Sequence, residues 1–312
     1  ESDVLQNALN HRGPDKYSVF TDDIVNMQFH RLKINDLSHE GDQPMSLNNC
    51  KLICNGEIFN HKELVTNFGF TTKSKSDCEV ILHLYNHFKI VYKNRDQIIM
   101  DTLCNILDGE FAFCLYDIEL SKVFYARDPY GVRPLFLNNI TYSAASELKA
   151  FKPDHHVHVH QFPPGHFTIL SKTNMNQCTF VKPILYTDIL MNEENQRFIN
   201  NHPYTDEKYE DILVSVKTLL ERAVKKRTMS DRNVCALLSG GLDSSLVAAL
   251  LSKTLDSKLK TFSIGFENSP DIKYANLVAK HIDSDHTNVI VSEDDFLNAI
   301  ETVIHVIESY DT

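Results

Sequence analysis

The sequence lacks the features by which membrane proteins and nucleic-acid-binding proteins are usually recognised. None of its apolar runs approaches the length of a membrane span, and no signal peptide opens the chain. The formal net charge is −11, so the chain has no basic surplus with which to neutralise phosphate groups. We therefore expect no membrane partner, no nucleic-acid partner and a cytoplasmic location.

The cysteines are not spaced along the chain as metal ligands are. The seven cysteines are scattered, odd in number and lie mostly within apolar segments. This pattern indicates reduced thiols rather than a disulfide framework or a zinc site. The 312 residues, of which 42% are hydrophobic and 23% charged, are enough for two domains with sizeable cores.

The two halves of the chain follow different patterns. Up to about residue 190, the sequence predicts a strand over 51–58, a helix over 77–88 and two hairpins, one over 111–126 and one with strands over 134–137 and 140–144. The sequence of this half therefore predicts short strands clustered around two helices, which suggests a layered α+β domain.

From Asp206 onward, helices and strands alternate. The predicted elements are, in order, a helix over 206–228, a strand over 233–238, a helix over 243–253, a strand over 260–265, a helix over 271–282, a strand over 287–291 and a helix over 292–309. Ser292-Glu293-Asp294-Asp295 is expected to cap the last helix, and its apolar stripe consists of Phe296, Ile300, Val303 and Ile307. Such alternation predicts a parallel, doubly wound α/β sheet, which binds ligands at the carboxyl ends of its strands. The polar segment 193–205 is the natural linker, so we predict domains over 1–192 and 206–312.

The first strand of the second half ends in a candidate phosphate-binding loop. Residues 238–245 read Leu-Ser-Gly-Gly-Leu-Asp-Ser-Ser. Glycines let the backbone approach a phosphate closely, and the N-terminus of the following helix supplies unpaired N–H donors. The hydroxyls of Ser239, Ser244 and Ser245 add donors. Asp243 suits a Mg²⁺ ligand, because a carboxylate beside a polyphosphate is repelled unless a cation bridges them.

This loop contains no Gly-Lys-Ser/Thr, so it is not the P-loop that presents a γ-phosphate. The alternative interpretation is a helix N-cap with a glycine turn, which Asp and Ser also favour. The whole string after a strand favours pyrophosphate binding. It resembles the pyrophosphatase-type loop of ATP-dependent enzymes that adenylate a substrate, and ATP and Mg²⁺ are the cofactors it implies.

The first half carries a series of motifs in order. They are His11-Arg12-Gly13-Pro14-Asp15, Arg31-Leu32, Cys54-Asn55-Gly56-Glu57-Ile58-Phe59-Asn60, Ser76-Asp77-Cys78-Glu79-Val80, Leu107-Asp108-Gly109-Glu110-Phe111-Ala112-Phe113 and Ala126-Arg127-Asp128-Pro129-Tyr130-Gly131. Together they resemble the glutaminase domain of class II glutamine amidotransferases, which has the layered αββα fold of N-terminal-nucleophile hydrolases. With the 238–245 loop and the segment 261–265 added, the chain resembles the glutamine-dependent asparagine synthetases, whose second domain is adenine nucleotide hydrolase-like.

The resemblance implies roles at a first site. Arg31 would grip the carboxylate of free glutamine, Glu57 and Asp77 would lie near its ammonium, and Asn55 with the Gly56 N–H would form the oxyanion hole. The glutamine-binding residues that it implies are Arg31, Leu32, Ile34, Asn55, Gly56, Glu57 and Asp77. Each has a structural alternative when taken singly: Asn-Gly is a turn signal, Arg31 could form a surface ion pair, and Asp77 could cap a helix. Arg12 and Asp128 would order the surrounding loops.

The chain also departs from the family pattern. Family members attack the amide with an N-terminal cysteine whose own α-amine serves as base, whereas this chain begins with Glu1. Cys54 does not replace it, because its nitrogen lies in a peptide bond within a strand. Residue 35 is Asn, where the family usually has an apolar side chain in the glutamine-contacting loop. We expect a fragment that lacks the nucleophile and the C-terminal part of the synthetase domain, and that is inactive alone.

At the second site, the resemblance implies that Leu238 and Ile264 contact the adenine nucleotide. Pyrophosphate and Mg²⁺ would be held by Ser239, Gly240, Gly241, Asp243, Ser244 and Ser245. The implied reaction adenylates the β-carboxylate of aspartate, and ammonia released from glutamine then displaces AMP. Glutamine, aspartate and ATP are the implied small-molecule partners, and a homodimer stays open.

Two alternatives to this function remain. An amidotransferase-like synthetase of the β-lactam synthetase type shares both halves but adenylates another carboxylate. A catalytically dead glutamine- and nucleotide-binding fragment is the alternative that is not an enzyme. The acceptor pocket would distinguish the two enzymes, and it would lie largely outside this sequence.

Overall fold

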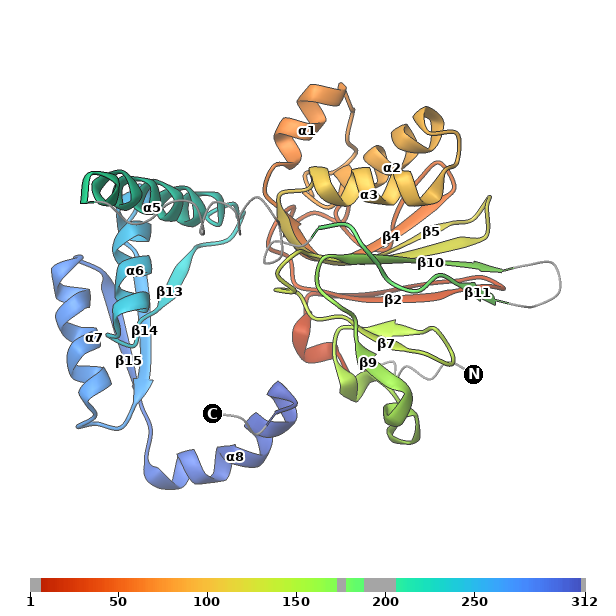
Figure 1. Ribbon diagram of the computed structural model, residues 1–312. Helices are drawn as coiled ribbons and strands as arrows, with labels where there is room; N and C mark the ends of the chain where they lie inside the picture. The colour runs from red at the N-terminus through yellow and green to blue at the C-terminus, as the bar shows by residue number, and fades with distance from the viewer. Residues whose placement is uncertain (1–6, 173–177, 188–205, 310–312) are drawn as a thin grey trace. The chain divides into compact units, whose positions relative to one another are not determined.

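The computed structural model describes residues 7–172, 178–187 and 206–309 (Figure 1). The chain divides into two compact units, Glu1–His202 and Pro203–Thr312. The division falls inside the linker predicted over 193–205, which itself lies outside the described residues. No helix in the described ranges is long and apolar enough to cross a membrane.

An antiparallel sheet of seven strands forms the centre of the first unit. Its order is β11-β10-β6-β5-β4-β3, and β12 also pairs with β10. The strands are β3 (Met45–Leu47), β4 (Cys50–Ile58), β5 (Gly109–Asp117), β6 (Lys122–Arg127), β10 (His166–Lys172), β11 (Cys178–Phe180) and β12 (Ile184–Leu185). The long β4–β5 pairing runs from Cys50 opposite Asp117 to Ile58 opposite Gly109, and this pair of strands carries much of the site described below.

Three helices cover one face of this sheet (Figure 1). They are α1 (His61–Phe68), α2 (Glu79–Val91) and α3 (Asp96–Ile106). Because side chains alternate along a strand, Leu52, Cys54 and Ile58 of β4 all point into the apolar core beneath these helices. The sequence predicted two helices here. The third is α3, whose buried residues Met100 and Leu103 complete the core.

A second β layer packs on the opposite face. It consists of the hairpin β1 (Lys16–Thr21) and β2 (Asn26–Arg31), together with a sheet of β7 (Phe136–Asn138), β8 (Ala144–Ala145) and β9 (Val159–Gln161). The second core contains Met27 of β2 and Leu137 of β7 packed near Tyr125 of the central sheet. The described residues thus form an α layer and two β layers. Next to β7–β9 they have only the short 3-10 helices η1 (Asn10–Arg12), η2 (Leu148–Ala150) and η3 (Pro153–His158), so the outer α layer of the predicted αββα arrangement is not seen in them.

The hairpin predicted over 134–144 is present, but the start of its second strand was wrong. Pairing resumes only at Ala144, opposite Leu137, and not at Ile140. The Asn138 side chain explains the difference, because its Oδ1 accepts hydrogen bonds from the N–H groups of Ile140 and Thr141 and holds these residues in a turn.

The second unit alternates as predicted. Its parallel sheet has the order β13-β14-β15, and the strands are β13 (Cys235–Leu237), β14 (Lys260–Gly265) and β15 (Asp285–Ile290). The helices are α5 (Asp206–Lys226), α6 (Leu242–Thr254), α7 (Pro270–His281) and α8 (Glu293–Ile307). Each strand feeds a helix, so the carboxyl ends of all three strands meet at one edge of the sheet.

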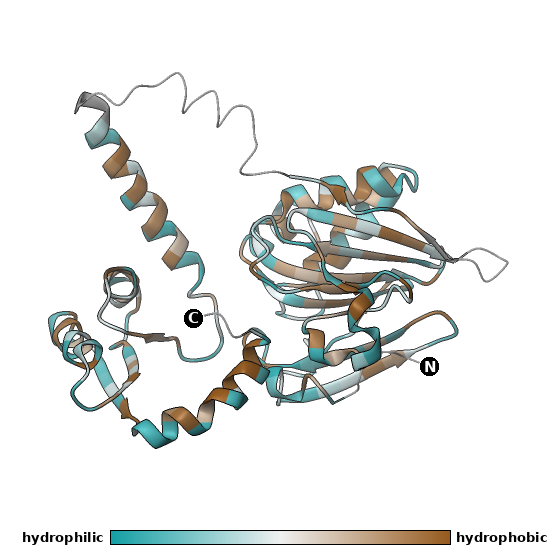
Figure 2. Ribbon diagram, turned by 60° about the horizontal axis from the view of Figure 1, so that its bottom comes forward, coloured by the Kyte–Doolittle hydropathy of each residue, from teal (hydrophilic) through white to brown (hydrophobic). Residues whose placement is uncertain are grey.

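Helices α6 and α7 both cover the same face of this sheet. Leu238, Ala248 of α6 and Ala275 of α7 belong to one apolar core. On the opposite face, Leu237 is 82% exposed and Ile264 is 68% exposed. The second helical layer of a doubly wound sheet therefore does not cover that face in residues 206–309. The predicted apolar stripe of α8 is also exposed, and Figure 2 shows much of this helix coloured as hydrophobic.

Candidate functional site

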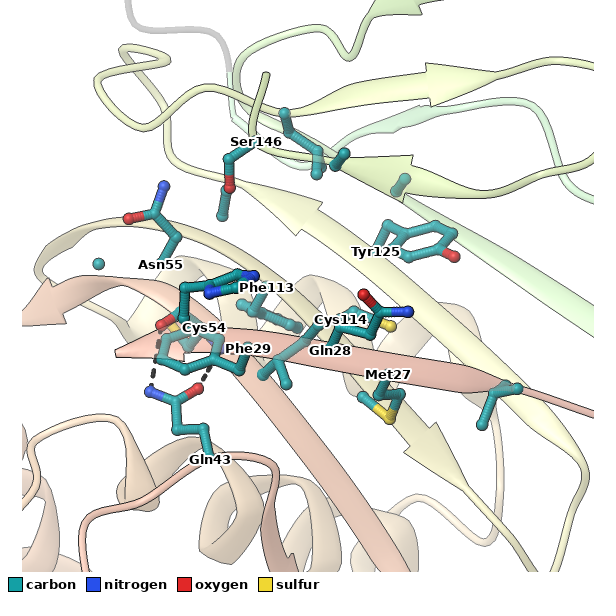
Figure 3. Close-up of a pocket in the computed structure, with 18 of the residues that line it drawn as sticks. Met27, Gln28, Phe29, Gln43, Cys54, Asn55, Phe113, Cys114, Tyr125 and Ser146 are labelled. Carbon is teal, nitrogen blue, oxygen red and sulfur yellow. Dashed lines mark hydrogen bonds between the residues drawn. The ribbon is translucent and has the colours of Figure 1, made fainter. Parts of the chain in front are cut away.

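A cavity of about 1010 Å³ lies in the first unit, on the face of the central sheet away from the helices. Its walls come from β2, β4, β5 and the segment 141–146 (Figure 3). All of the predicted glutamine-binding residues line it: Arg31, Leu32, Ile34, Asn55, Gly56, Glu57 and Asp77. Residues far apart in the sequence are thus brought to one site, as the motifs predicted.

Asn55 is placed by the alternation of β4. Its neighbour Cys54 points into the core under the helices, so Asn55 points the other way, and Figure 3 shows its amide extending into the cavity on the side of Ser146. Asn55 Nδ2 is buried and has no hydrogen-bond partner among the described residues. A buried N–H without a partner costs about 1–3 kcal/mol. It is therefore a ready donor for an oxygen of a bound ligand.

Gly56 is required where β4 meets β5. A Cβ at this position would lie 2.2 Å from the carbonyl oxygen of Glu110 and 2.7 Å from the Cα of Phe111. Any larger residue would push the two strands apart. The predicted oxyanion-hole pair, Asn55 and Gly56, therefore lies on a rigid, closely paired stretch of sheet rather than on a free loop.

Asp77 is a buried carboxylate at the edge of the cavity. It is 3% exposed and lies two residues before α2. Its Oδ2 accepts the N–H of Ile58 at 2.6 Å, and its Oδ1 accepts Asn35 Nδ2 at 3.2 Å. Burial raises the pKa of Asp77, and the hydrogen bonds from Ile58 and Asn35 and the charge of His61 oppose that rise. A buried carboxylate beside a cavity is suited to receive a cationic group such as an ammonium.

Arg31 uses its guanidinium to hold its own loop. Nη1 donates to the carbonyl of Ser38 at 2.8 Å and to Asp42 Oδ1 at 2.7 Å. Nη2 donates to the carbonyl of Asn35 at 3.1 Å and to that of Asp36. Arg31 is only 5% exposed. Its grip on a glutamine carboxylate stays a prediction, and it requires that these donors be shared with or released to the ligand.

The remaining predicted residues of this site lie at its rim. Leu32 is exposed, and Glu57 Oε1 lies 3.9 Å from Arg133 Nη2. Arg12 donates to Glu147 Oε1 at 2.7 Å. Asp128 accepts the backbone N–H groups of Tyr130, Val132 and Arg133, each at 3.0 Å. Arg12 and Asp128 thus make the kind of contacts that the predicted loop-ordering role requires.

Several residues that organise the site were not found from the sequence. Asp36 Oδ2 accepts the N–H of Lys75 at 2.8 Å and so ties the loop after β2 to the loop before α2. Gln43 pairs with the backbone of Cys54 in both directions: its Oε1 accepts the Cys54 N–H at 2.6 Å, and its Nε2 donates to the Cys54 carbonyl at 3.2 Å (Figure 3). The only sequence signal for Asp36 and Gln43 is that both are polar residues in a segment rich in motifs.

Glu79 holds the loop before α2 from the other side. Its carboxylate accepts the N–H groups of Lys73 and Ser74, each at 2.7 Å, and lies 3.2 Å from His83 Nε2. Burial by itself raises the pKa of Glu79, but the hydrogen bonds from His83, Ser74 and Lys73 outweigh it and lower the pKa to about 2. The loop that carries Asp77 is therefore anchored by an ionised carboxylate at neutral pH.

The predicted phosphate loop of the second unit makes a sharp turn against α7. Gly240 has φ +81°, and a Cβ there would lie 2.5 Å from the Ala275 nitrogen and 2.6 Å from Tyr274 Cβ. Gly241 then begins α6 as its N-cap residue. The turn therefore needs a glycine at 240, and it presents the first backbone N–H groups of α6, which have no partners within the helix.

The side chains of this loop form a polar surface. Ser239 Oγ and Ser244 Oγ lie 2.9 Å apart, and Ser245 Oγ is buried without a hydrogen-bond partner in the described part of the chain. Asp243 is exposed in the first turn of α6. Hydroxyls and free N–H groups suit a polyphosphate, and one carboxylate suits Mg²⁺, which takes most of its other ligands from water and phosphate.

The two predicted adenine contacts differ in exposure. Ile264 is exposed at the end of β14, where a nucleotide could reach it. The Leu238 side chain is buried in the core with Ala248 and Ala275, so this residue could meet a nucleotide only through its backbone. Both assignments stay predictions.

Comparisons with known proteins identify relatives of both units. The chain matches the family model of the glutamine amidotransferase domain over residues 3–182 and that of asparagine synthase over residues 215–312. It is 38% identical over 338 residues to asparagine synthetase [glutamine-hydrolyzing] of Gallus gallus, with 96% of this chain and 55% of that protein covered. It is 37% identical over 331 residues to the Homo sapiens protein of the same name, with the same coverage.

A viral relative is equally similar. The chain is 37% identical over 321 residues to the probable asparagine synthetase [glutamine-hydrolyzing] of Acanthamoeba polyphaga mimivirus, with 97% of this chain and 56% of that protein covered. The chain thus spans about half the length of the curated relatives it matches.

Proposed function

This chain belongs to the glutamine amidotransferase family, and we propose that the native protein makes asparagine from aspartate, ATP and ammonia released from glutamine. One observation carries the proposal: a single chain joins a cavity lined by the predicted glutamine-binding residues to a glycine- and serine-rich loop at the start of a helix, and both halves match the corresponding family models. An amidotransferase whose acceptor has no carboxylate to adenylate would have no use for the second half.

At the first site, we propose that Asn55 and the Gly56 N–H bind the side-chain amide oxygen of glutamine. As a nucleophile attacks the amide carbon, that oxygen gains charge, and the unpaired Asn55 N–H is in place to donate to it. Asp77 receives the α-ammonium, and this fixes the amino-acid end of the ligand. Arg31 holds its own loop through hydrogen bonds to Ser38 and Asp42, and from this position its guanidinium binds the α-carboxylate of glutamine.

Cys54 and Cys78 also belong to the lining of this cavity, but neither thiol has the character of the nucleophile. Both are buried. A hydrogen bond with Cys54 and burial raise the pKa of the Cys78 thiol well above its usual value. The nitrogen of Cys54 is a peptide nitrogen whose N–H donates to Gln43 Oε1, so Cys54 has no free α-amine to serve as a base. The proposal therefore assigns the attack to a group outside the described residues.

At the second site, the 239–245 loop holds the pyrophosphate end of ATP. Ser239, Ser244 and the first N–H groups of α6 donate to phosphate oxygens, and Asp243 would hold Mg²⁺, which neutralises charge on the phosphates when bound. Adenylation is needed because a carboxylate is a poor acceptor for ammonia, whereas a mixed anhydride carries a good leaving group.

The proposal includes the finer fold assignments. The glutaminase domain, an N-terminal-nucleophile hydrolase, would occupy 1–192 and the adenine nucleotide hydrolase-like domain would occupy 206–312. Six of the cysteines form no disulfide bond, which fits a reducing, cytoplasmic setting; they are Cys50, Cys54, Cys78, Cys104, Cys114 and Cys235. A homodimer would be compatible with these assignments.

Aspartate-dependent exchange between pyrophosphate and ATP tests the synthetase half. The native protein, purified at its full encoded length, is incubated with ATP, Mg²⁺ and labelled pyrophosphate, with aspartate or with one of a panel of other carboxylic acids. We expect label to enter ATP only with aspartate. Exchange with a different carboxylate would favour the β-lactam synthetase type, and no exchange with any acid would favour a binding protein without synthetase activity.

A further inference from the structure

The side chain of Asn35 lies beside the buried carboxylate of the first site. Asn35 Nδ2 donates to Asp77 Oδ1 at 3.2 Å, and both residues line the cavity. A carboxylate only accepts hydrogen bonds, so the nitrogen of the Asn35 amide must face it and the oxygen must face away.

The loop that carries Asn35 is tightly fixed relative to Asp77. The Asn35 carbonyl accepts a hydrogen bond from Arg31 at 3.1 Å. Its neighbour Asp36 accepts the N–H of Lys75, two residues before Asp77, at 2.8 Å. Asp36 also accepts the N–H of Ser38 at 3.0 Å. The Asp36–Lys75 hydrogen bond thus ties together two loops that are distant in the sequence, and the other two hydrogen bonds fix the 31–38 loop itself.

Few groups support the Asp77 carboxylate. The end of β4 provides the Ile58 N–H at 2.6 Å, and α1 provides the charge of His61. Asp77's own neighbour Cys78 approaches Oδ2 with its thiol at 3.8 Å. Within the described ranges, Asn35 is the only residue whose side-chain N–H reaches this carboxylate. Without it, Oδ1 would be buried with no strong donor, and a hydrogen bond to a charged group contributes about 1.5–3 kcal/mol.

We propose that Asn35 is a positioning residue for substrate recognition: its amide nitrogen holds Asp77 Oδ1 so that the carboxylate receives the ammonium of a free α-amino-acid amide. The half-buried Asn35 Oδ1, which accepts no hydrogen bond from the described residues, then offers that ammonium a second acceptor. This inference rests on the proposed function, since it concerns how the glutamine site selects its ligand.

The test measures glutamine binding by calorimetry in the native protein at its full encoded length, from about pH 5 to 8. The variants are Asn35→Val, which removes the donor, and Asn35→Asp, which keeps the shape but replaces the donor with a second carboxylate. Leu37→Val is the matched control, since Leu37 is in the same loop, is 41% exposed and lies outside the cavity lining. Glutamine-dependent and ammonia-dependent asparagine formation are measured in parallel.

We expect Asn35→Val to raise the Kd for glutamine about 10-fold or more, as the loss of a charge-assisted hydrogen bond predicts. Asn35→Asp should weaken binding further at neutral pH. Losing the donor disfavours the ionised form of Asp77, so binding by Asn35→Val should be lost at a higher pH than in the wild type as the pH is lowered. Ammonia-dependent synthesis and Leu37→Val should be unaffected.

An unchanged Kd and an unchanged pH profile in Asn35→Val would overturn the inference. So would an equal loss of glutamine-dependent and ammonia-dependent synthesis, which would make Asn35 a folding residue. A wild-type protein that binds glutamine but forms no asparagine would refute the proposed function alone, while the binding comparison would still decide the role of Asn35. A wild type that does not bind glutamine would overturn both.

Discussion

The turn at Gly240 offers a sharp test of the phosphate loop, because the next residue is a built-in control. An alanine at 240 would have to adopt φ near +81°, with its Cβ 2.5 Å from the Ala275 nitrogen and 2.6 Å from Tyr274 Cβ. An alanine at 241 keeps an ordinary φ of −70°, and its Cβ would meet only Ser239 Oγ, at 3.5 Å. The two variants have the same composition and differ only in which glycine is lost.

The expected cost for Gly240→Ala combines two effects. The left-handed conformation costs a non-glycine residue about 1–2 kcal/mol. Forcing a methyl group against the backbone of α7 costs about 1–3 kcal/mol, as overpacking in a core does. Together these give ~2–5 kcal/mol in the stability of the second unit. Gly241→Ala changes only an N-cap residue without a side-chain hydrogen bond, so its cost should stay below about 1 kcal/mol.

The assay follows urea unfolding by circular dichroism, because the chain has no tryptophan to serve as a fluorescent probe. A fluorescent ATP analogue reports binding in the same samples. We expect the Gly240→Ala transition of the second unit to shift to lower urea, and its nucleotide binding to fall well below that of Gly241→Ala, because the methyl group displaces the turn that presents the first N–H groups of α6. Equal stability of the two variants, or a more stable Gly240→Ala, would refute the structural argument for this turn.

Three further predictions concern single carboxylates. Asp77→Ala should impair glutamine-dependent synthesis while leaving ammonia-dependent synthesis nearly intact, because free ammonia bypasses the first site; parallel loss of both activities would contradict this. Asp243→Asn should weaken binding of Mg²⁺–ATP far more than binding of metal-free ATP, and calorimetry that found equal losses would count against a metal-ligand role. Glu79 has a pKa lowered from 4.5 to about 2, so the stability that its ionised form contributes is present above pH 4.5 and is lost as the pH falls towards 2. Glu79→Gln should therefore lower the free energy of unfolding by about 3 kcal/mol near neutral pH, and the stability of this variant should depend less on acid pH than that of the wild type. Unfolding curves in which both proteins lose stability equally as the pH falls would exclude the assigned role.

The parts of the fold that follow from local sequence were predicted well. The alternation after Asp206 gives a parallel sheet, as predicted, because periodic apolar residues specify each element without help from distant contacts. The start of α8 was also predicted, and Ser292 and Asp295 form the expected capping box there. At the first site, short motifs spread over the sequence between residues 31 and 77 do converge on one cavity.

The parts that failed depend on long-range hydrogen bonds that no local pattern encodes. Asp36 binds the Lys75 N–H across the fold, and Gln43 completes the backbone pairing of Cys54, yet neither residue has a periodic signal. The hydrogen bonds from Arg31 to the carbonyls of Ser38 and Asn35 in its own loop were likewise not foreseen, while its role at a ligand stays a prediction. The type of a side chain suggests which groups it can bind. Which groups it does bind depends on the atoms that the folded chain places beside it, and the local sequence does not specify them.

The most direct test of the central claim follows the amide nitrogen. The native protein at its full encoded length is given glutamine labelled with ¹⁵N in its side-chain amide, together with aspartate, ATP and Mg²⁺, and the products are analysed by mass spectrometry. The account predicts that the label appears in the side-chain amide of asparagine, with one AMP formed for each asparagine. Label that stays in glutamine, or that enters an amide of any other carboxylic acid while aspartate is left unchanged, would contradict it.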